Sequence, residues 1–438
     1  MLRQARPKWR YDGVIKGGSK MRNNVSKWIF AVLALGLAAT GPAAGADSVL
    51  LSAAISGEGK LLSDLKEMVR IESGSANVAG LTHMADFLEG ELKALGMQTE
   101  RIKATSGPGA YMLKGTLTGN GRKRIMLIGH MDTVYPEGIL KTQPYHVEGN
   151  RIYGPGIADD KGGLAVVLQS LRILKAAGWR DYATLTVLFN PDEEIGSIGS
   201  GEIIAALAAE NDYVLSCEPT AAKDVAKREG LLLGAAGTAT VTMEVTGRQA
   251  HAGVAPELGR NALVELSNQI VQTRDITKSV PGTQLNWTFS NAGLVRNQIP
   301  EKAVATADVR LFARDGAERL LAALQAKVAE SRLVPDTRTA VTMLVGRPPF
   351  AGDERSKALG KKAQAVYAEL DSRPLELTPM TGGATDAGYA SRSGKAVVLE
   401  SFGLAGFGYH ARDEYIEIDS IVPRLYLMTR LLMEIGRN

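Results

Sequence analysis

Acidic and histidine side chains follow several short apolar runs of this chain, and they are the residues best suited to chemistry. Three runs, at 123–128, 184–190 and 213–217, end in this way. The polar residues after them are His130 and Asp132, Glu193 and Glu194, and Glu218. Clustered carboxylates repel one another strongly unless cations lie between them. The pattern therefore predicts a metal site if the three runs meet.

A glycine-rich loop offers two further carboxylates. Residues 153–163 read YGPGIADDKGG and include Asp159 and Asp160. Glycine permits backbone conformations that other residues resist, and carboxylates bind zinc alongside histidine. An apolar run that predicts a helix follows the loop. A single loop of this kind is only suggestive by itself. We expect it to join the metal site together with the polar residues that follow the three apolar runs.

The elements that must position these residues alternate between strand and helix, which is typical of an α/β domain with a largely parallel sheet. In such a sheet, ligands bind beyond the carboxyl ends of the strands. Asn120-Gly121 lies between two of the strands and is a strong hairpin signal. Strands are predicted at 110–117, 123–128, 184–190, 213–217 and 396–400, and helices at 61–71, 80–95, 163–177, 195–209, 356–370 and 419–435.

The pattern changes between residues 237 and 345. The predicted order there is β-α-β-β-α-β, which is the order of a ferredoxin-like α+β domain. The first pattern resumes after this segment. We therefore expect a catalytic domain split into residues 47–236 and 346–438, with an inserted lid or dimerisation domain at 237–345.

The N-terminal 46 residues resemble an extension followed by a secretory signal peptide. A basic segment begins at Met21, a short apolar run follows, and Ala44-Gly45-Ala46 resembles a cleavage site. We expect cleavage after Ala46, a secreted, periplasmic protein and no stable membrane insertion afterwards; a buried helix or a membrane anchor is the alternative. This segment holds eight basic residues and one acidic residue, so the formal charge falls from +4 to about −3 without it. The basic pI therefore gives no support to nucleic-acid binding.

The chain resembles the di-zinc aminoacylase/carboxypeptidase family, and within it the bacterial glutamate carboxypeptidases that cleave folates. The resemblance covers about residues 50 to 435. It rests on five motifs: GHMDTV at 129–134, the loop at 154–163, LFNPDEE at 188–194, EPT at 218–220 and GFGYH at 406–410.

The resemblance implies two zinc ions per subunit. Asp159 would bridge them, His130 and Glu218 would complete one site, and Glu194 and His410 would complete the other. Zinc ions in such sites lie roughly 3.5–4 Å apart and hold a water between them.

The resemblance also assigns catalytic roles. Glu193 would be the general base, because a carboxylate near the metals but not bound to them can have its pKa tuned toward working pH. Asp132 would orient the imidazole of His130. The peptide bond between Asp159 and Asp160 is expected to be cis.

The inserted domain would supply the substrate end of the site. By resemblance, His251 would stabilise the oxyanion, often in the active site of a partner subunit, so we expect a homodimer. Asn297 and Arg310 would hold the free carboxylate of the substrate, for which the planar guanidinium of arginine is suited. The loop containing Gly383 offers backbone N–H groups to the substrate.

The resemblance therefore implies a zinc carboxypeptidase that hydrolyses the amide bond before a C-terminal glutamate in folates or N-acyl glutamates. Its substrate would be a small molecule or short peptide with a free carboxylate. The alternatives are an aminoacylase or dipeptidase of the same family and, more remotely, a non-catalytic binding protein. The basic residues Lys223, Lys227 and Arg228 are candidates for recognition of an acidic side chain.

Overall fold

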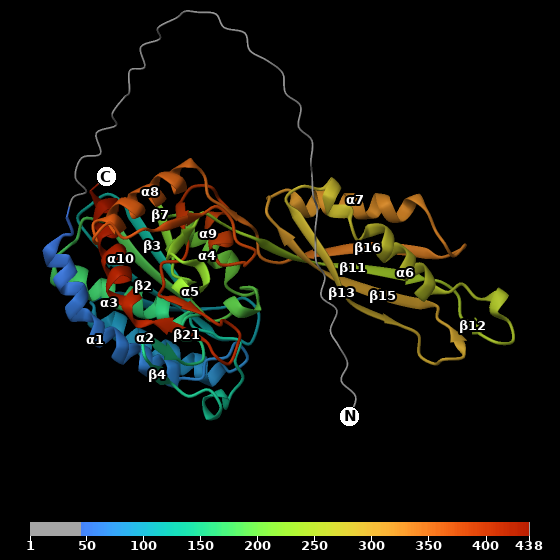
Figure 1. Ribbon diagram of the computed structural model, residues 1–438, viewed down its shortest axis with the longest axis horizontal. Helices are drawn as coiled ribbons and strands as arrows, with labels where there is room; N and C mark the ends of the chain where they lie inside the picture. The colour runs from blue at the N-terminus through green and yellow to red at the C-terminus, as the bar shows by residue number, and fades with distance from the viewer. Residues whose placement is uncertain (1–44, 438) are drawn as a thin grey trace, which may run out of the picture. The chain divides into compact units, whose positions relative to one another are not determined.

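The structure is a computed structural model, and it describes residues 45–437 (Figure 1). The expected signal peptide lies outside the described residues, except for Gly45 and Ala46. No helix in residues 45–437 combines the length and the apolar character that crossing a membrane requires.

A six-stranded sheet forms the centre of the larger part of the fold, in the order β1-β2-β6-β3-β7-β19. β6, β3, β7 and β19 run parallel to one another, and β1 and β2 are antiparallel additions at one edge. This mixed, largely parallel sheet confirms the predicted fold class. The strands are β1 (Gln98–Lys103), β2 (Tyr111–Thr118), β3 (Arg124–His130), β6 (Thr184–Asn190), β7 (Tyr213–Ser216) and β19 (Val397–Leu399).

The hairpin predicted from Asn120-Gly121 is wrong, because β6 lies between β2 and β3. The loop instead packs against residues 180–183, where Asn120 N–H donates to the carbonyl of Arg180 at 2.7 Å. A Cβ atom on Gly119 would lie 2.2 Å from the carbonyl oxygen of Tyr182. The glycines of this loop therefore permit a close backbone approach and do not form a two-residue turn between paired strands.

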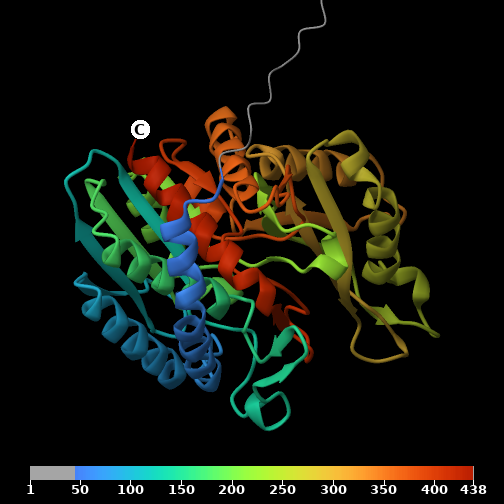
Figure 2. The same cartoon turned by 60° about the vertical axis from the view of Figure 1, so that its left-hand side comes forward.

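Helices cover both faces of the central sheet. Side chains alternate along β3, so Ile125 and Leu127 face one apolar cluster while Met126 and Ile128 face another. Figures 1 and 2 show α1, α3 and α10 together on the first side, where they contact one another. The helices of the first side are α1 (Ser48–Arg70), α2 (Val78–Ala94), α3 (Lys161–Ala176), α8 (Glu354–Ala368) and α10 (Ile421–Gly436), and those of the second are α4 (Gly201–Ala208) and α9 (Ala387–Ser391).

A five-stranded sheet joins distant parts of the chain beside the central sheet, in the order β4-β5-β21-β20-β8. It links residues near 150 with residues near 410. One predicted metal ligand, Asp159, follows the first segment, and another, His410, lies in the second. Its strands are β4 (His146–Glu148), β5 (Arg151–Tyr153), β8 (Thr220–Ala221), β20 (Ala405–Phe407) and β21 (Tyr415–Glu417).

The segment between β11 and β16 forms a separate antiparallel sheet in the order β13-β15-β11-β16. Two helices share one apolar cluster with this sheet, so both cover the same face. This is the predicted β-α-β-β-α-β arrangement. Its elements are β11 (Gly237–Thr246), α6 (Ala262–Thr273), β13 (Thr283–Ala292), β15 (Lys302–Leu311), α7 (Gly316–Glu330) and β16 (Arg338–Val345).

Two chain segments connect this inserted domain to the rest, and they are hydrogen bonded to each other. Thr238 N–H donates to the carbonyl of Arg347 at 2.8 Å, and Arg347 N–H donates to Thr238 Oγ1 at 3.0 Å. Next to them, β10 (Gly234–Ala235) pairs with β17 (Phe350–Ala351). The backbone position of Arg347 is therefore fixed where the two domains join.

Candidate metal centre

The carboxyl ends of three neighbouring strands bring predicted residues to one edge of the central sheet. β3 lies between β6 and β7 and runs parallel to both. His130 is the last residue of β3, Glu193 and Glu194 lie in the turn after β6, and Glu218 lies just beyond β7. Parallel pairing alone therefore gathers residues that are up to 88 positions apart in the sequence.

The five-stranded sheet supplies the other two predicted ligands. Asp159 lies in the loop between β5 and α3, and His410 follows β20. β21 pairs with both β5 and β20, so these two segments are held near each other. The peptide bond between Asp159 and Asp160 is cis, as expected.

Asp159 lies between two histidines. Its Oδ1 is 3.0 Å from His130 Nε2, and its Oδ2 is 3.5 Å from His410 Nε2. Glu218 Oε1 is 3.7 Å from His130 Nε2, and Glu194 Oε2 is 3.1 Å from His410 Nε2. Each oxygen of one carboxylate thus faces a different histidine–glutamate pair, which is the arrangement that a bridging carboxylate needs.

The donor set fits divalent metal ions of the zinc type. Imidazole nitrogens and carboxylate oxygens are common zinc ligands. Burial and the negative charge of Asp159 raise the pKa of Glu218 well above its usual range. Cations between the carboxylates would remove this electrostatic cost. In residues 45–437, the groups close enough to hold an ion are His130 with Asp159 and Glu194, and His130 with Glu193 and Glu218.

Asp132 contacts both His130 and the turn that contains Glu193 and Glu194. Its carboxylate accepts hydrogen bonds from Glu193 N–H at 3.0 Å, Glu194 N–H at 3.1 Å and Ser75 Oγ at 2.7 Å. His130 Nδ1 is 3.0 Å from the main-chain oxygen of Asp132 and 3.3 Å from its carboxylate. A proton on Nδ1 would leave Nε2 free to bind a metal ion.

Glu414 holds the loop that carries Asp159, and sequence reasoning missed it. Its buried carboxylate accepts hydrogen bonds from the N–H groups of Gly156 at 2.8 Å, Ala158 at 2.9 Å and Asp159 at 3.0 Å. Tyr135 Oη donates to it at 2.7 Å. Burial raises the pKa of Glu414 to about 7, although the hydrogen bond from Asp159 N–H opposes the rise. No local pattern marks this glutamate, which stabilises the loop from 255 positions away.

Arg347 is a second missed residue, and it contacts the predicted general base. Its Nη1 lies 2.9 Å from Glu193 Oε1 and donates to the carbonyl of Ala384 at 2.6 Å, and its Nη2 donates to the carbonyl of Glu193. Burial raises the pKa of Glu193 to about 8, and the positive charge of Arg347 limits the rise. The guanidinium of Arg347 therefore holds both the carboxylate and the main-chain carbonyl of Glu193.

A cavity of about 650 Å³ opens beside these residues and is lined by Asp159, Glu193, Arg310, Arg347 and Gly383, among others. Arg310 Nε lies 3.0 Å from Asp308 Oδ1, and Nη1 donates to the carbonyl of Gly382 at 3.4 Å. Two predicted substrate-binding residues, Arg310 and Gly383, thus lie in the same cavity as the predicted ligands.

The three basic residues of 221–230 do not line this cavity. Lys223 pairs with Asp419 at 2.5 Å on the surface, and Lys227 and Arg228 are exposed.

His251 and Asn297 are not brought to the metal centre within this chain, since neither lines the cavity. His251 is exposed, and its Nδ1 accepts hydrogen bonds from Gly253 N–H and Val254 N–H, both at 3.1 Å. The main-chain oxygen of Asn297 accepts from Ala252 N–H at 2.9 Å. The two residues therefore lie close to each other, on the short strands β12 (Ala250–His251) and β14 (Gln298–Ile299) and the turn before β14.

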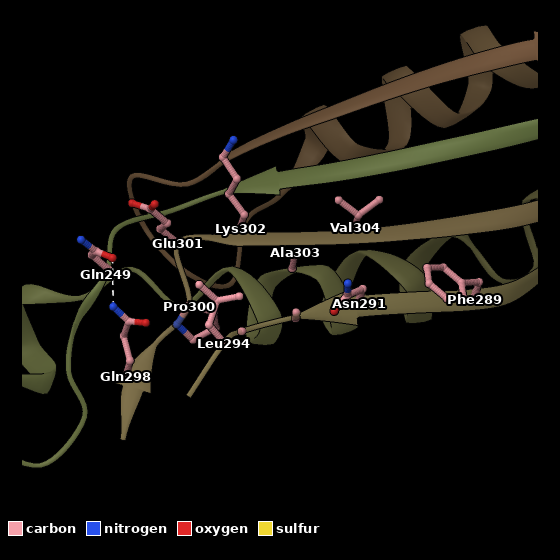
Figure 3. Close-up of a pocket in the computed structure, with 12 residues that line it drawn as sticks. Gln249, Phe289, Asn291, Leu294, Gln298, Pro300, Glu301, Lys302, Ala303 and Val304 are labelled. Atoms are coloured by element: carbon pink, nitrogen blue, oxygen red, sulfur yellow. Dashed lines mark hydrogen bonds between the residues drawn. The ribbon is translucent and has the colours of Figure 1, made fainter. Parts of the chain in front are cut away.

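A second cavity, of about 450 Å³, lies on the inserted domain next to β14 (Figure 3). Phe289 and Asn291 of β13 line it, together with Leu294 and Gln298. Gln298 Nε2 donates to Gln249 Oε1 at 2.9 Å, and both side chains line the cavity (Figure 3). It contains none of the predicted metal ligands.

Comparison with known proteins identifies the family. Carboxypeptidase G2 of a Pseudomonas species is 44% identical over 410 residues, which cover 93% of this chain and 97% of that protein. A succinyl-diaminopimelate desuccinylase of Xanthomonas oryzae is 26% identical over 368 residues, or 80% of this chain and 93% of the enzyme. The solved structure of a tripeptidase of Staphylococcus aureus has the same fold, with a TM-score of 0.72 and 21% identity over 87% of this chain and 99% of that one.

The match extends to the model of a whole family. Residues 126–434 match Peptidase family M20/M25/M40, and this range contains every predicted ligand. The chain belongs to peptidase family M20/M25/M40.

Proposed function

We propose that the protein is a di-zinc carboxypeptidase that releases C-terminal glutamate from N-acyl glutamates, including folate-type compounds. The observation that carries the proposal is the placement of Asp159 between two histidines, beside a cavity lined by Arg310 and Arg347. The likeness to carboxypeptidase G2 supports carboxypeptidase activity, and the resemblance of the sequence motifs to glutamate carboxypeptidases supports the substrate class.

In this proposal, different residues of the chain bind the metal ions and the substrate. His130, Asp159, Glu194, Glu218 and His410 hold two zinc ions, which supply a Lewis acid and an activated water when they are bound. Arg310 binds the free carboxylate of the substrate, and Gly383 lies beside it.

Glu193 carries the proton transfers. Its carboxylate takes a proton from the attacking water and passes it to the nitrogen of the leaving amine. Arg347 keeps the carboxylate of Glu193 in place during both transfers.

A substrate panel on chelator-treated and zinc-reloaded protein tests this function. We expect reloaded protein to release glutamate from N-acyl glutamates much faster than other amino acids from matched N-acyl compounds, and chelated protein to be inactive. Faster release of another amino acid would favour a deacylase such as the desuccinylases to which the chain is also similar. Activity that persists without metal would overturn the proposal.

We also propose that the enzyme is a homodimer in which His251 and Asn297 serve the partner's active site. Exposed apolar side chains on and near the edge strand β13, including Phe289 and Leu294, support this, because an open sheet edge favours pairing with another chain.

Mixing two inactive variants tests the dimer proposal. A hybrid of H251A and E193Q would contain one intact site only if His251 acts across the interface. We expect mixed, refolded or co-expressed variants to regain activity up to about a quarter of that of the wild type, the share set by random pairing. No recovery in a mixture shown to contain hybrid dimers would contradict it.

Export through residues 1–46 is also part of the proposal, supported by the basic, apolar and small-residue segments that begin at Met21. The mass of the mature protein recovered from a bacterial periplasm tests it; we expect Asp47 as the first residue.

A further inference from the structure

We propose that Ser401 is a specificity-determining residue whose hydroxyl donates a hydrogen bond to the side-chain carboxylate of the C-terminal glutamate. Ser401 follows β19 and lines the cavity that contains Arg310, Gly383 and four of the predicted metal ligands. The inference rests on the proposed function, because it names a residue that distinguishes glutamate from other leaving amino acids.

A C-terminal glutamate brings two carboxylates into a cavity that has few cations to receive them. The lysine and arginine side chains that line the cavity are Arg310 and Arg347. In the proposed function, Arg310 binds the α-carboxylate. Arg347 is already occupied, because its Nη1 lies 2.9 Å from Glu193 Oε1 and donates to the carbonyl of Ala384 at 2.6 Å. The side-chain carboxylate is therefore left to an uncharged donor.

The hydroxyl of Ser401 is such a donor, and it is unpaired. Its Oγ makes no hydrogen bond with any part of residues 45–437. Ser401 is only 3% exposed, yet its Oγ is not among the fully enclosed, unpartnered polar atoms of this range, so the oxygen opens to the cavity. A buried hydroxyl without a partner costs free energy, and a bound ligand can supply the missing partner.

Two other hydroxyl groups that line the cavity give their hydrogens to the protein itself. Thr385 Oγ1 donates to Glu400 Oε2 at 2.7 Å. Tyr409 Oη donates to the carbonyl of Gly406 at 2.8 Å. Because a hydroxyl has a single hydrogen to donate, neither group is free to donate to a substrate.

The two remaining hydroxyl groups lie beside the residues that bind the α-carboxylate in the proposed function. Thr238 of β11 is the cross-strand neighbour of Arg310 on β15. Thr381 Oγ1 accepts a hydrogen bond from Gly383 N–H at 3.3 Å. Ser401 is therefore the hydroxyl of this cavity that is left for the second carboxylate.

Buried charged side chains hold the backbone on both sides of Ser401. Its N–H donates to Glu400 Oε1 at 2.6 Å, and its carbonyl accepts a hydrogen bond from Nη2 of Arg424, which is 1% exposed. The φ angle of Ser401 is +74°, in the left-handed region that residues other than glycine seldom adopt. Glycine would suit this backbone better, so a serine held here indicates a use for the hydroxyl.

Leu232 supplies an apolar surface next to Ser401. Leu232 N–H donates to the carbonyl of Glu400 at 3.0 Å, and Glu400 N–H donates to the carbonyl of Leu232 at 3.3 Å. Leu232 lines the same cavity as Ser401. A glutamate side chain has two methylene groups before its carboxylate, which matches a leucine beside a hydroxyl donor.

The test compares N-benzoyl-L-glutamate with N-benzoyl-L-norvaline, in which a methyl group replaces the side-chain carboxylate. We expect S401G to lose about tenfold or more in kcat/KM for benzoylglutamate, because a hydrogen bond to a charged group is lost, and no more than about twofold for benzoylnorvaline. Glycine suits the backbone of residue 401, so S401G should keep the zinc content and the Tm of the wild type.

The variant S372G is the matched control. Ser372 also has a positive φ angle, of +59°, but it is exposed and lines no cavity described here. S372G should therefore change kcat/KM for neither substrate. Inhibition by the free amino acids gives a second readout: in S401G the Ki of L-glutamate should rise about tenfold, and that of L-norvaline should stay within about twofold.

The outcomes separate the role of Ser401 from the proposed function. A benzoylglutamate-to-benzoylnorvaline ratio that S401G leaves unchanged would overturn the role of Ser401 alone, whether both substrates keep their rates or lose equally. Failure of the zinc-loaded wild type to prefer benzoylglutamate over benzoylnorvaline would overturn the proposed function and the role of Ser401 together.

Discussion

Replacing Arg347 by methionine should damage both folding stability and turnover, because the guanidinium is buried against Glu193. Arg347 and Glu193 side chains are only 6% and 8% exposed, and Asp386 Oδ1 lies 3.8 Å from Arg347 Nε. The methionine would leave two buried carboxylates without their positive partner. It would also remove the Arg347 donor from the carbonyl of Ala384, and one of two donors from the carbonyl of Glu193, which also accepts from Gly196 N–H at 2.8 Å.

The size of the effect follows from these contacts. Removing one partner of a buried ion pair costs about 3–5 kcal/mol, a large part of the roughly 5–15 kcal/mol that stabilises an ordinary domain. General acid–base catalysis contributes about 10²–10⁴-fold to rate. Displacement of Glu193 should therefore lower kcat by at least about 10²-fold. KM should change much less, because Arg310 remains in place to bind the carboxylate.

Urea unfolding and steady-state kinetics on the zinc-loaded protein measure the two effects. The control R355M removes an exposed arginine that also donates to two carbonyls, those of Gly394 and Lys395, and should cost about 1 kcal/mol or less. R347K keeps the positive charge, so its losses of stability and of kcat should lie between those of R347M and R355M. An R347M protein within 1 kcal/mol of the wild type and with unchanged kcat would refute the reasoning. A raised KM with normal kcat would show that Arg347 binds substrate and does not position the base.

Three further changes test other parts of the account. E193Q should keep its zinc, as measured by metal analysis, and lose about 10²-fold or more in kcat; near-normal activity would remove Glu193 from the mechanism. R310A should raise KM for N-acyl glutamates by about tenfold or more, because a charge-assisted hydrogen bond to the carboxylate is lost; a change no larger than that of R355M would contradict this. Hydrogen bonds from Lys93 and Arg101 lower the pKa of Glu89 from 4.5 to about 2. Because the folded pKa is lower, this stabilisation is present in full above pH 4.5 and is lost as pH falls toward 2. E89Q should thus be less stable at pH 7 by about 1 kcal/mol, allowing for solvent screening, and the difference should shrink below pH 4.5; a difference independent of pH would be inconsistent with it.

The sequence allowed the sheet and the convergence of the predicted ligands to be anticipated, because both depend on local patterns. Apolar runs predict buried parallel strands, and parallel strands place their carboxyl ends at one edge. Once the strands are adjacent and parallel, the residues that follow them lie close together. This is the case for His130, Glu194 and Glu218. The alternation along β11 likewise marked the inserted antiparallel sheet.

Long-range contacts could not be predicted in this way. Glu414 and Arg347 act through hydrogen bonds to residues more than 150 positions away, and nothing in their local sequence distinguishes them from surface residues. Asn120-Gly121 was misleading for the opposite reason. Its local signal is strong, but the backbone of residues 180–183 determines its conformation. His251 stays a prediction whose test needs a second subunit.

Titration of metal-free protein with zinc tests the central claim most directly. If Asp159 bridges two ions, binding and glutamate release should both saturate at two zinc equivalents per chain. D159A should bind less than two equivalents and lose activity, whereas D419A, which removes an exposed carboxylate paired with Lys223, should behave as the wild type. Saturation of both signals at one equivalent, or full activity in D159A, would contradict the account.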